Sequence, residues 1–124
     1  MKLNELTPML WVDDVRQTID YYVNTLGFEE GNYSADWQWG VVEKDKVVIM
    51  FTKPNEHTAY NRASFTGSLY LRTDDVETCW EQLKHKATVY YPIDDFEYGM
   101  REFAIRDCNG YILQFGQDIS PDSQ

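Results

Sequence analysis

The pentapeptide Trp11-Val12-Asp13-Asp14-Val15 recurs 61 residues further along the chain as Arg72-Thr73-Asp74-Asp75-Val76. After each copy, apolar side chains continue at helical spacing, namely Val15, Ile19 and Tyr22 in the first half and Val76, Trp80 and Leu83 in the second. The paired aspartates are suitable N-cap residues for two amphipathic helices. A repeat of this length in a chain of 124 residues predicts two copies of one structural module.

Strand-like runs surround each predicted helix. One run with alternating apolar residues precedes each helix, at 6–12 and at 68–73. Three more runs follow each helix, at 28–33, 37–43 and 47–52 in the first half and at 89–93, 101–106 and 111–116 in the second. Polar turns at 44–46 and 107–110 join the last two runs of each half as hairpins. Each half therefore predicts the element order βαβββ.

The length of the chain suits a single domain spanning residues 1–124. We expect module one at about 5–53 and module two at about 68–117. The segment between them, at about 54–67, carries proline, asparagine and glycine without a sustained period, and it is interpreted as a linker.

The duplicated unit resembles a known family when two further motifs are considered. Tyr21-Tyr22 precedes Leu26-Gly27-Phe28, and the final hairpin turn is built on the stretch 106–111. Together these features closely resemble the glyoxalase/bleomycin-resistance (vicinal oxygen chelate) superfamily over about residues 5–117. The resemblance implies an α+β fold in which two tandem βαβββ modules form a cupped mixed β-sheet with helices on its outer face. It also implies a ligand cavity inside the cup and a homodimer.

The resemblance further implies where a metal ion would be held in an enzyme of this superfamily. The ligands are His, Gln or Glu side chains from the first and last strands of each module, and the matching positions here are Thr7, Met50, Ser68 and Gln114. These four side chains offer no carboxylate and no imidazole, so a hard divalent ion would be held weakly. We expect no metal ion and no other cofactor. His57 and His85 are expected to face solvent.

Period-two alternation from Thr7 and Ser68 predicts which other side chains line the cup. The predicted ligand-binding residues are Met9, Trp11, Trp37, Trp39, Tyr70, Arg72, Arg101, Phe103 and Gln114. Trp37 and Trp39 share one strand face, and Arg101 and Phe103 are placed at the related positions of the second half. Aromatic rings stack on planar or cationic ligands. The alternative is that these rings pack in the core or in the dimer interface.

No side chain is singled out as a catalytic base. Glu43, Glu102 and Asp107 are candidates for a metal-independent enzyme, but we expect the two glutamates to face solvent or an ion pair and Asp107 to order its turn. Cys79 and Cys108 lack metal-binding or catalytic spacing and are expected to be reduced thiols.

The charge of the chain restricts its partners. A formal net charge of −10 at pH 7 would repel nucleic acid, and no apolar run reaches the length needed to cross a bilayer. Because no secretory signal is recognised, a cytoplasmic protein is expected. The sequence thus predicts a metal-independent homodimer that binds a planar or cationic, antibiotic-like small molecule. Two alternatives remain, a lyase or dioxygenase with an atypical metal site and a protein-interaction module with a filled cup.

Overall fold

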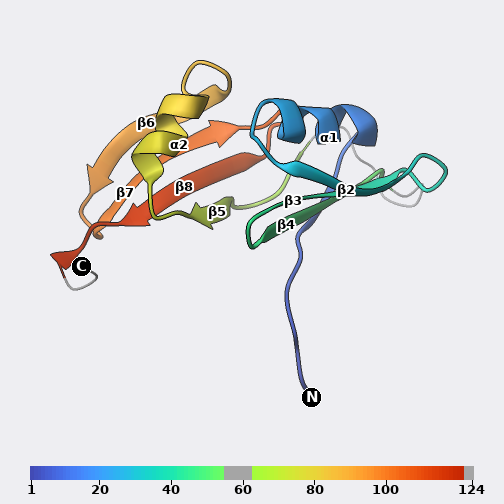
Figure 1. Ribbon diagram of the computed structural model, residues 1–124, viewed down its shortest axis with the longest axis horizontal. Coiled ribbons are helices and arrows are strands. Elements are labelled where there is room, and N and C mark those ends of the chain that lie inside the picture. The colour runs from blue at the N-terminus through green and yellow to red at the C-terminus, as the bar shows by residue number, and fades with distance from the viewer. Residues whose placement is uncertain (55–62, 122–124) are drawn as a thin grey trace. The chain divides into compact units, whose positions relative to one another are not determined.

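The computed structural model describes residues 1–54 and 63–121 and divides into two compact units, Met1–Ala63 and Ser64–Gln124. Each unit contains one helix and one four-stranded mixed sheet in the order βαβββ (Figure 1), which confirms the α+β class and the two predicted modules. The boundary between the units falls within the predicted linker, of which residues 55–62, His57 included, lie outside the described residues. The single domain, the joint cup and the homodimer stay predictions.

Unit 1 consists of β1 (Met9–Trp11), α1 (Val15–Asn24), β2 (Glu29–Ser34), β3 (Trp39–Lys44) and β4 (Val47–Thr52). The strand order is β1-β4-β3-β2, and β1 is parallel to β4 while the other neighbours are antiparallel. The helix packs against β2, β3 and β4. The buried apolar side chains of the unit are Leu10, Val12, Val15, Ile19, Tyr22, Leu26, Phe28, Val42, Ile49 and Phe51.

Unit 2 repeats this arrangement with β5 (Leu69–Arg72), α2 (Val76–Leu83), β6 (Thr88–Phe96), β7 (Met100–Arg106) and β8 (Ile112–Asp118). Its strand order is β5-β8-β7-β6, again with one parallel pair, β5 with β8. The helix packs against β7 and β8. The buried apolar side chains are Val76, Leu83, Phe103, Ala104, Ile105, Tyr111 and Leu113.

The second aspartate of each repeated motif caps its helix, as the sequence predicts. The Asp14 carboxylate accepts a hydrogen bond of 3.0 Å from the backbone N–H of Gln17, and the Asp75 carboxylate accepts one of 3.2 Å from the backbone N–H of Thr78. Hydrogen bonds from Thr78 also lower the pKa of Asp75. After α1 the chain turns at Gly27, whose φ of 81° is a conformation that favours glycine.

The turn before β8 is ordered by the carboxylate of Asp107. One carboxylate oxygen of this buried residue accepts hydrogen bonds from the backbone N–H groups of Asn109, at 2.8 Å, and Tyr111, at 2.9 Å. The predicted structural role of Asp107 is therefore confirmed. In the described part of the chain, neither helix has the length and apolar character needed to span a membrane.

Candidate functional site

The two faces of the unit 2 sheet have different surroundings. On one face, the Trp80 ring of α2 lies 5.2 Å from the Phe103 ring of β7. Neighbouring residues of a strand point to opposite faces, so Glu102 lies on the face away from α2. Gln114 of β8 is the direct cross-strand partner of Tyr70 of β5 and hydrogen-bonds to Glu102, which brings three strands together on this second face.

The polar centre of this face is the carboxylate of Glu102, whose side chain is fully buried. Its Oε1 accepts hydrogen bonds from the hydroxyls of Tyr70, at 3.3 Å, and of Tyr98. Its Oε2 accepts one from the Tyr91 hydroxyl and another, of 3.1 Å, from Nε2 of Gln114. Both carboxylate oxygens thus accept hydrogen bonds from neutral donors, four in all. This satisfies the hydrogen-bonding capacity of a buried polar group.

Gln114 links this carboxylate to the start of β5. Its Nε2 also donates to the Tyr91 hydroxyl at 2.8 Å, and its Oε1 accepts a hydrogen bond from the Ser68 hydroxyl. Both the oxygen and the nitrogen of the Gln114 amide are hydrogen-bonded, which fixes the orientation of the amide group. We call this network the Glu102 cluster, and its members are Ser68, Tyr70, Tyr91, Tyr98, Glu102 and Gln114.

The cluster contains one buried carboxyl group and no cationic side chain. Among the residues that the structure describes, no Lys, Arg or His forms an ion pair with Glu102. The hydrogen bond to Glu102 raises the pKa of Tyr98 to about 12. Burial, followed by the nearby carboxylate, raises the pKa of Tyr70, and burial also raises the pKa of Tyr91. All three phenols are therefore protonated donors at neutral pH.

Tyr70 reaches Glu102 across a glycine. A Cβ atom at Gly116, the β8 residue that pairs with Glu102, would lie 2.0 Å from the Tyr70 hydroxyl oxygen. The absence of a side chain at Gly116 leaves the space that the hydroxyl end of the Tyr70 ring occupies beside β8. The ring is 39% exposed, and the Arg72 guanidinium lies 5.8 Å from its centroid.

Tyr98 enters the cluster from the turn between β6 and β7. Its ring stacks on Phe96 with centroids 5.5 Å apart and an angle of 14° between the planes, and Phe96 meets Tyr91 edge-on at 5.8 Å. The Tyr98 side chain is 65% exposed although its hydroxyl is bonded to Glu102. The cluster consequently presents aromatic rings to the outside and keeps their hydroxyls fixed on the buried carboxylate.

The corresponding face of unit 1 has an apolar character. Met9 pairs with Met50, and Trp11 and Trp39 both pair with Thr52, so these side chains share the face of the sheet that alternation predicts. Met9 is 54% exposed. Trp37 lies apart from them in the turn before β3 and is 83% exposed.

The predicted positions of Arg101 and Phe103 are wrong by one residue in the strand register. In unit 1, Trp39 pairs with Thr52. The residue of unit 2 that corresponds to Thr52 is Gly116, and Gly116 pairs with Glu102. A slip of one residue moves every side chain to the other face of a sheet. Phe103 is fully buried on the α2 side, so we leave it and Arg101 out of the site.

The expectation that Glu102 faces solvent or an ion pair is also wrong, because it is buried among phenols. One signal for its position is readable in the sequence. Counting back across the turn at 107–110 pairs Arg106 with Ile112 and hence Glu102 with Gly116, two residues beyond Gln114. Nothing in the sequence shows that Tyr91 and Tyr98 approach the same carboxylate.

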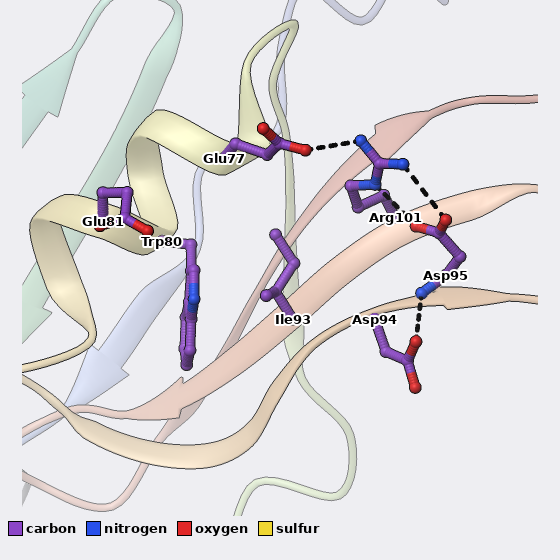
Figure 2. Close-up of a pocket in the computed structure, with 7 residues that line it drawn as sticks. All are labelled: Glu77, Trp80, Glu81, Ile93, Asp94, Asp95 and Arg101. Carbon is purple, nitrogen blue, oxygen red and sulfur yellow. Dashed lines mark hydrogen bonds and ion pairs between the residues drawn. The ribbon is translucent and has the colours of Figure 1, made fainter.

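A pocket lies on the α2 side of unit 2. This pocket of about 410 Å³ is lined by Glu77, Trp80, Glu81, Ile93, Asp94, Asp95 and Arg101 (Figure 2). Arg101 bridges the carboxylates of Glu77, at 2.7 Å, and Asp95, at 2.6 Å, and it lowers the pKa of Asp95. Exposed ion pairs of this kind contribute little to stability. The guanidinium is occupied by these two acids, which indicates a structural role for Arg101.

The four positions that match metal ligands do not fit a metal ion. Ser68 and Gln114 hydrogen-bond to each other, and the Gln114 amide is filled by Tyr91 and Glu102 as well. Thr7 and Met50 add only a hydroxyl and a thioether, which are poor ligands for a hard divalent ion. Within residues 1–54 and 63–121, no three His, Cys, Asp or Glu side chains are grouped so that they could hold a metal.

The family of the chain follows from its sequence and fold together. The model of the Glyoxalase/Bleomycin resistance protein/Dioxygenase superfamily matches residues 2–115. The chain belongs to this superfamily. Among proteins with curated descriptions, none matches it significantly.

Solved structures share the superfamily fold at low sequence identity. TioX from Micromonospora sp. ML1 is 17% identical, with a TM-score of 0.76 over 93% of this chain and 98% of that one. The bleomycin-binding protein of Streptomyces verticillus, complexed with copper(II)-bleomycin, is 22% identical, with a TM-score of 0.70 over 93% and 96%. A superfamily member from Sphaerobacter thermophilus DSM 20745 is 21% identical, with a TM-score of 0.76 over 94% and 98%. At these identities the likeness concerns the fold.

Proposed function

We propose that this superfamily member binds a small organic molecule with a planar ring system, and that it does so without a metal ion. The proposed site is the surface of the Glu102 cluster, with Tyr70, Arg72 and Gln114 as contacts. The observation that carries the proposal is the combination of exposed rings with fixed hydroxyls. Tyr70 and Tyr98 are 39% and 65% exposed, yet both are anchored on a buried carboxylate.

A surface of this kind is suited to ligand binding because little of it must be ordered when a ligand arrives. A tyrosine ring offers a large amphipathic contact area with few rotatable bonds, and here the hydroxyl end is already held. The hydrogen-bonded amide of Gln114 further supports the absence of a metal, since its oxygen accepts from Ser68. The binding of copper(II)-bleomycin by the Streptomyces verticillus protein shows that this fold can hold a small molecule.

The first test is a fluorescence titration with acridine, 9-aminoacridine and bleomycin, using protein freed of metals by a chelator. We expect saturable binding of at least one of these compounds. For the two acridines, which do not carry a metal ion themselves, we expect no change in affinity when Zn²⁺, Mn²⁺ or Ni²⁺ is added. Elemental analysis of the same samples should find no stoichiometric metal. Binding that requires one metal ion per chain would overturn metal independence and favour a lyase or dioxygenase. The absence of any binding would count against the proposal itself.

Replacing Gly116 with alanine should weaken ligand binding at least about tenfold, which corresponds to about 1.4 kcal/mol. The added methyl group would overlap the Tyr70 hydroxyl, so the exposed ring must leave the sheet and lose its contact with Glu102. The measurement is the affinity for whichever compound the wild-type protein binds, with circular dichroism to confirm folding.

A double-mutant cycle with Tyr70→Leu provides the control for Gly116→Ala. If alanine acts by displacing the Tyr70 ring, it should have almost no further effect once that ring is absent. An undiminished loss in the Tyr70→Leu background would show that the Tyr70 ring is not the contact that Gly116 permits.

A further inference from the structure

Asn109 and Gly110 form the only Asn-Gly pair of the sequence, and they lie in the turn between β7 and β8. Asparagine is a chemically labile residue, and it loses ammonia most readily before glycine, because a residue without a Cβ leaves its main-chain nitrogen unhindered. In this protein the pair belongs to a turn whose hydrogen bonds centre on Asp107. The turn therefore controls the reactivity of Asn109.

The reaction makes two demands on the main chain at Asn109. The nitrogen of Gly110 must lose its proton to a base and then reach the side-chain carbonyl carbon of Asn109. The new N–C bond closes a succinimide ring, the bond to the side-chain nitrogen breaks, and that nitrogen leaves as ammonia with a proton from water. Water then opens the ring at either carbonyl, which leaves aspartate or isoaspartate at position 109.

The hydrogen bonds of the turn oppose the loss of the proton. The Gly110 N–H donates to the main-chain carbonyl of Asp107 at 3.1 Å, and the Asp107 N–H donates to the carbonyl of Tyr111 at 2.8 Å. A main-chain N–H that is held by a carbonyl oxygen gives up its proton less readily than one without an acceptor. The Gly110 nitrogen is thus a poor nucleophile while the turn is closed.

The conformation of the turn opposes ring closure. Gly110 has a φ of 94°, whereas neither Cys108 nor Asn109 has a positive φ. Together with the hydrogen bond from Gly110 to Asp107, these angles define a type I turn followed by a left-handed glycine. The third residue of a type I turn, here Asn109, has a ψ of about 0°. This ψ turns the Gly110 nitrogen away from the Asn109 Cβ, so the ring closes only after the Cα–C bond has rotated.

The side chain of Asp107 holds the turn in this form. One carboxylate oxygen of this buried residue accepts hydrogen bonds from the N–H groups of Asn109, at 2.8 Å, and Tyr111, at 2.9 Å. Asp107 thus binds the main chain on both sides of the peptide bond between Asn109 and Gly110. We propose that Asn109 is a site of spontaneous deamidation, and that the hydrogen bonds of Asp107 keep it unreactive until the turn opens. This inference is independent of the proposed function.

The modification would affect more than the turn. Isoaspartate routes the main chain through the side chain and lengthens the turn by one carbon atom. The pairing of β7 with β8 begins next to this turn, with Arg106 opposite Ile112, and continues to Glu102 opposite Gly116. The turn sets the register of a hairpin, so the isoaspartate form should pair the two strands less well and unfold at a lower temperature.

The test follows the conversion of Asn109 at mildly alkaline pH by mass spectrometry of proteolytic peptides, with an enzymatic methylation assay for isoaspartate. The reference is a synthetic peptide with the sequence of residues 104–113. We expect Asn109 to react at least about tenfold more slowly in the folded protein than in the peptide, since the reaction must await local opening. Asp107→Ala should raise the rate in the folded protein about tenfold, as the loss of hydrogen bonds to a carboxylate allows.

Three further variants separate the turn from a general loss of stability. Asp107→Asn keeps an oxygen that can accept both N–H groups, so its rate should lie between those of the wild-type protein and Asp107→Ala. Phe103→Leu weakens the buried core of unit 2 outside the turn, and Asp74→Ala removes an exposed carboxylate from the same unit. Both of these should deamidate at the wild-type rate.

A second measurement on the wild-type protein covers the case in which Asp107→Ala does not fold. In urea that unfolds the chain, Asn109 should react as fast as in the peptide. Equal rates in the folded protein and the peptide would overturn the protection by the turn. A rate in Phe103→Leu as high as in Asp107→Ala would assign the protection to global stability. An Asn109 that does not react even in the peptide would overturn the site itself.

Discussion

Replacing Phe103 with alanine is expected to lower the free energy of unfolding by about 3–5 kcal/mol, as for other large buried aromatic side chains. The Phe103 ring is fully buried and lies 5.2 Å from the Trp80 ring and 5.0 Å from the Phe115 ring, between α2 and the sheet. Alanine would leave a cavity that these rings cannot fill without moving. Urea denaturation followed by circular dichroism measures the loss.

Phe103→Leu is the control, because leucine fills most of the same volume and should cost about 1–2 kcal/mol. This pair of variants also decides between the two roles considered for the residue. If Phe103 is a core residue that does not contact the ligand, the Phe103→Leu variant should keep normal ligand affinity. A variant that unfolds like the wild-type protein but binds acridine compounds more weakly would instead make Phe103 a ligand contact and return it to the site.

Replacing Glu102 with alanine is expected to lower the free energy of unfolding by about 1–3 kcal/mol, the effect of removing a buried hydrogen-bonding partner. Tyr91 and Gln114 would each lose an acceptor in a partly buried setting, while the exposed Tyr70 and Tyr98 can turn to water. Thermal and urea denaturation of Glu102→Ala and Glu102→Gln provide the measurement.

The glutamine variant should lie within about 1 kcal/mol of the wild-type protein, since it keeps the shape of the cluster. Its amide oxygen can accept from Tyr91 and Gln114, and the hydroxyls of Tyr70 and Tyr98 can turn to accept hydrogen bonds from its amide nitrogen. An alanine variant that is more stable than the wild-type protein would contradict the expectation. That result would mean that the buried charge destabilises the fold by more than its four hydrogen bonds contribute, and that Glu102 is retained for binding.

The repeated motif was sufficient to predict the modules because the helix caps and turns that define each module are formed by residues close together in the sequence. Helix capping by Asp14 and Asp75 and the turn built on Asp107 depend on residues within four positions of each other. Alternation along the strands was sufficient to place Met9, Trp11 and Tyr70 on one face of their sheets, since the period of a strand is two. The metal-ligand positions came from the resemblance, and their residues already indicated a weak site.

The candidate site required contacts between residues that are distant in the sequence. Alternation within β7 is equally compatible with Glu102 or with Arg101 and Phe103 facing away from α2, and only pairing with β8 decides between them. The role of Gly116 likewise depends on the ring of Tyr70, which belongs to a strand 46 residues earlier.

The sequence by itself thus determined the α+β class, the two βαβββ modules and the poor metal-ligand set, because these follow from local periodicity and from residue chemistry. Only the tertiary structure decided that Glu102 is buried and that Tyr70, Tyr91, Tyr98 and Gln114 converge on its carboxylate. The physical reason is that the hydrogen-bond partners of Glu102 come from three other strands and a turn. Which residues of these strands meet is set by the pairing register of every neighbouring pair of strands in the sheet.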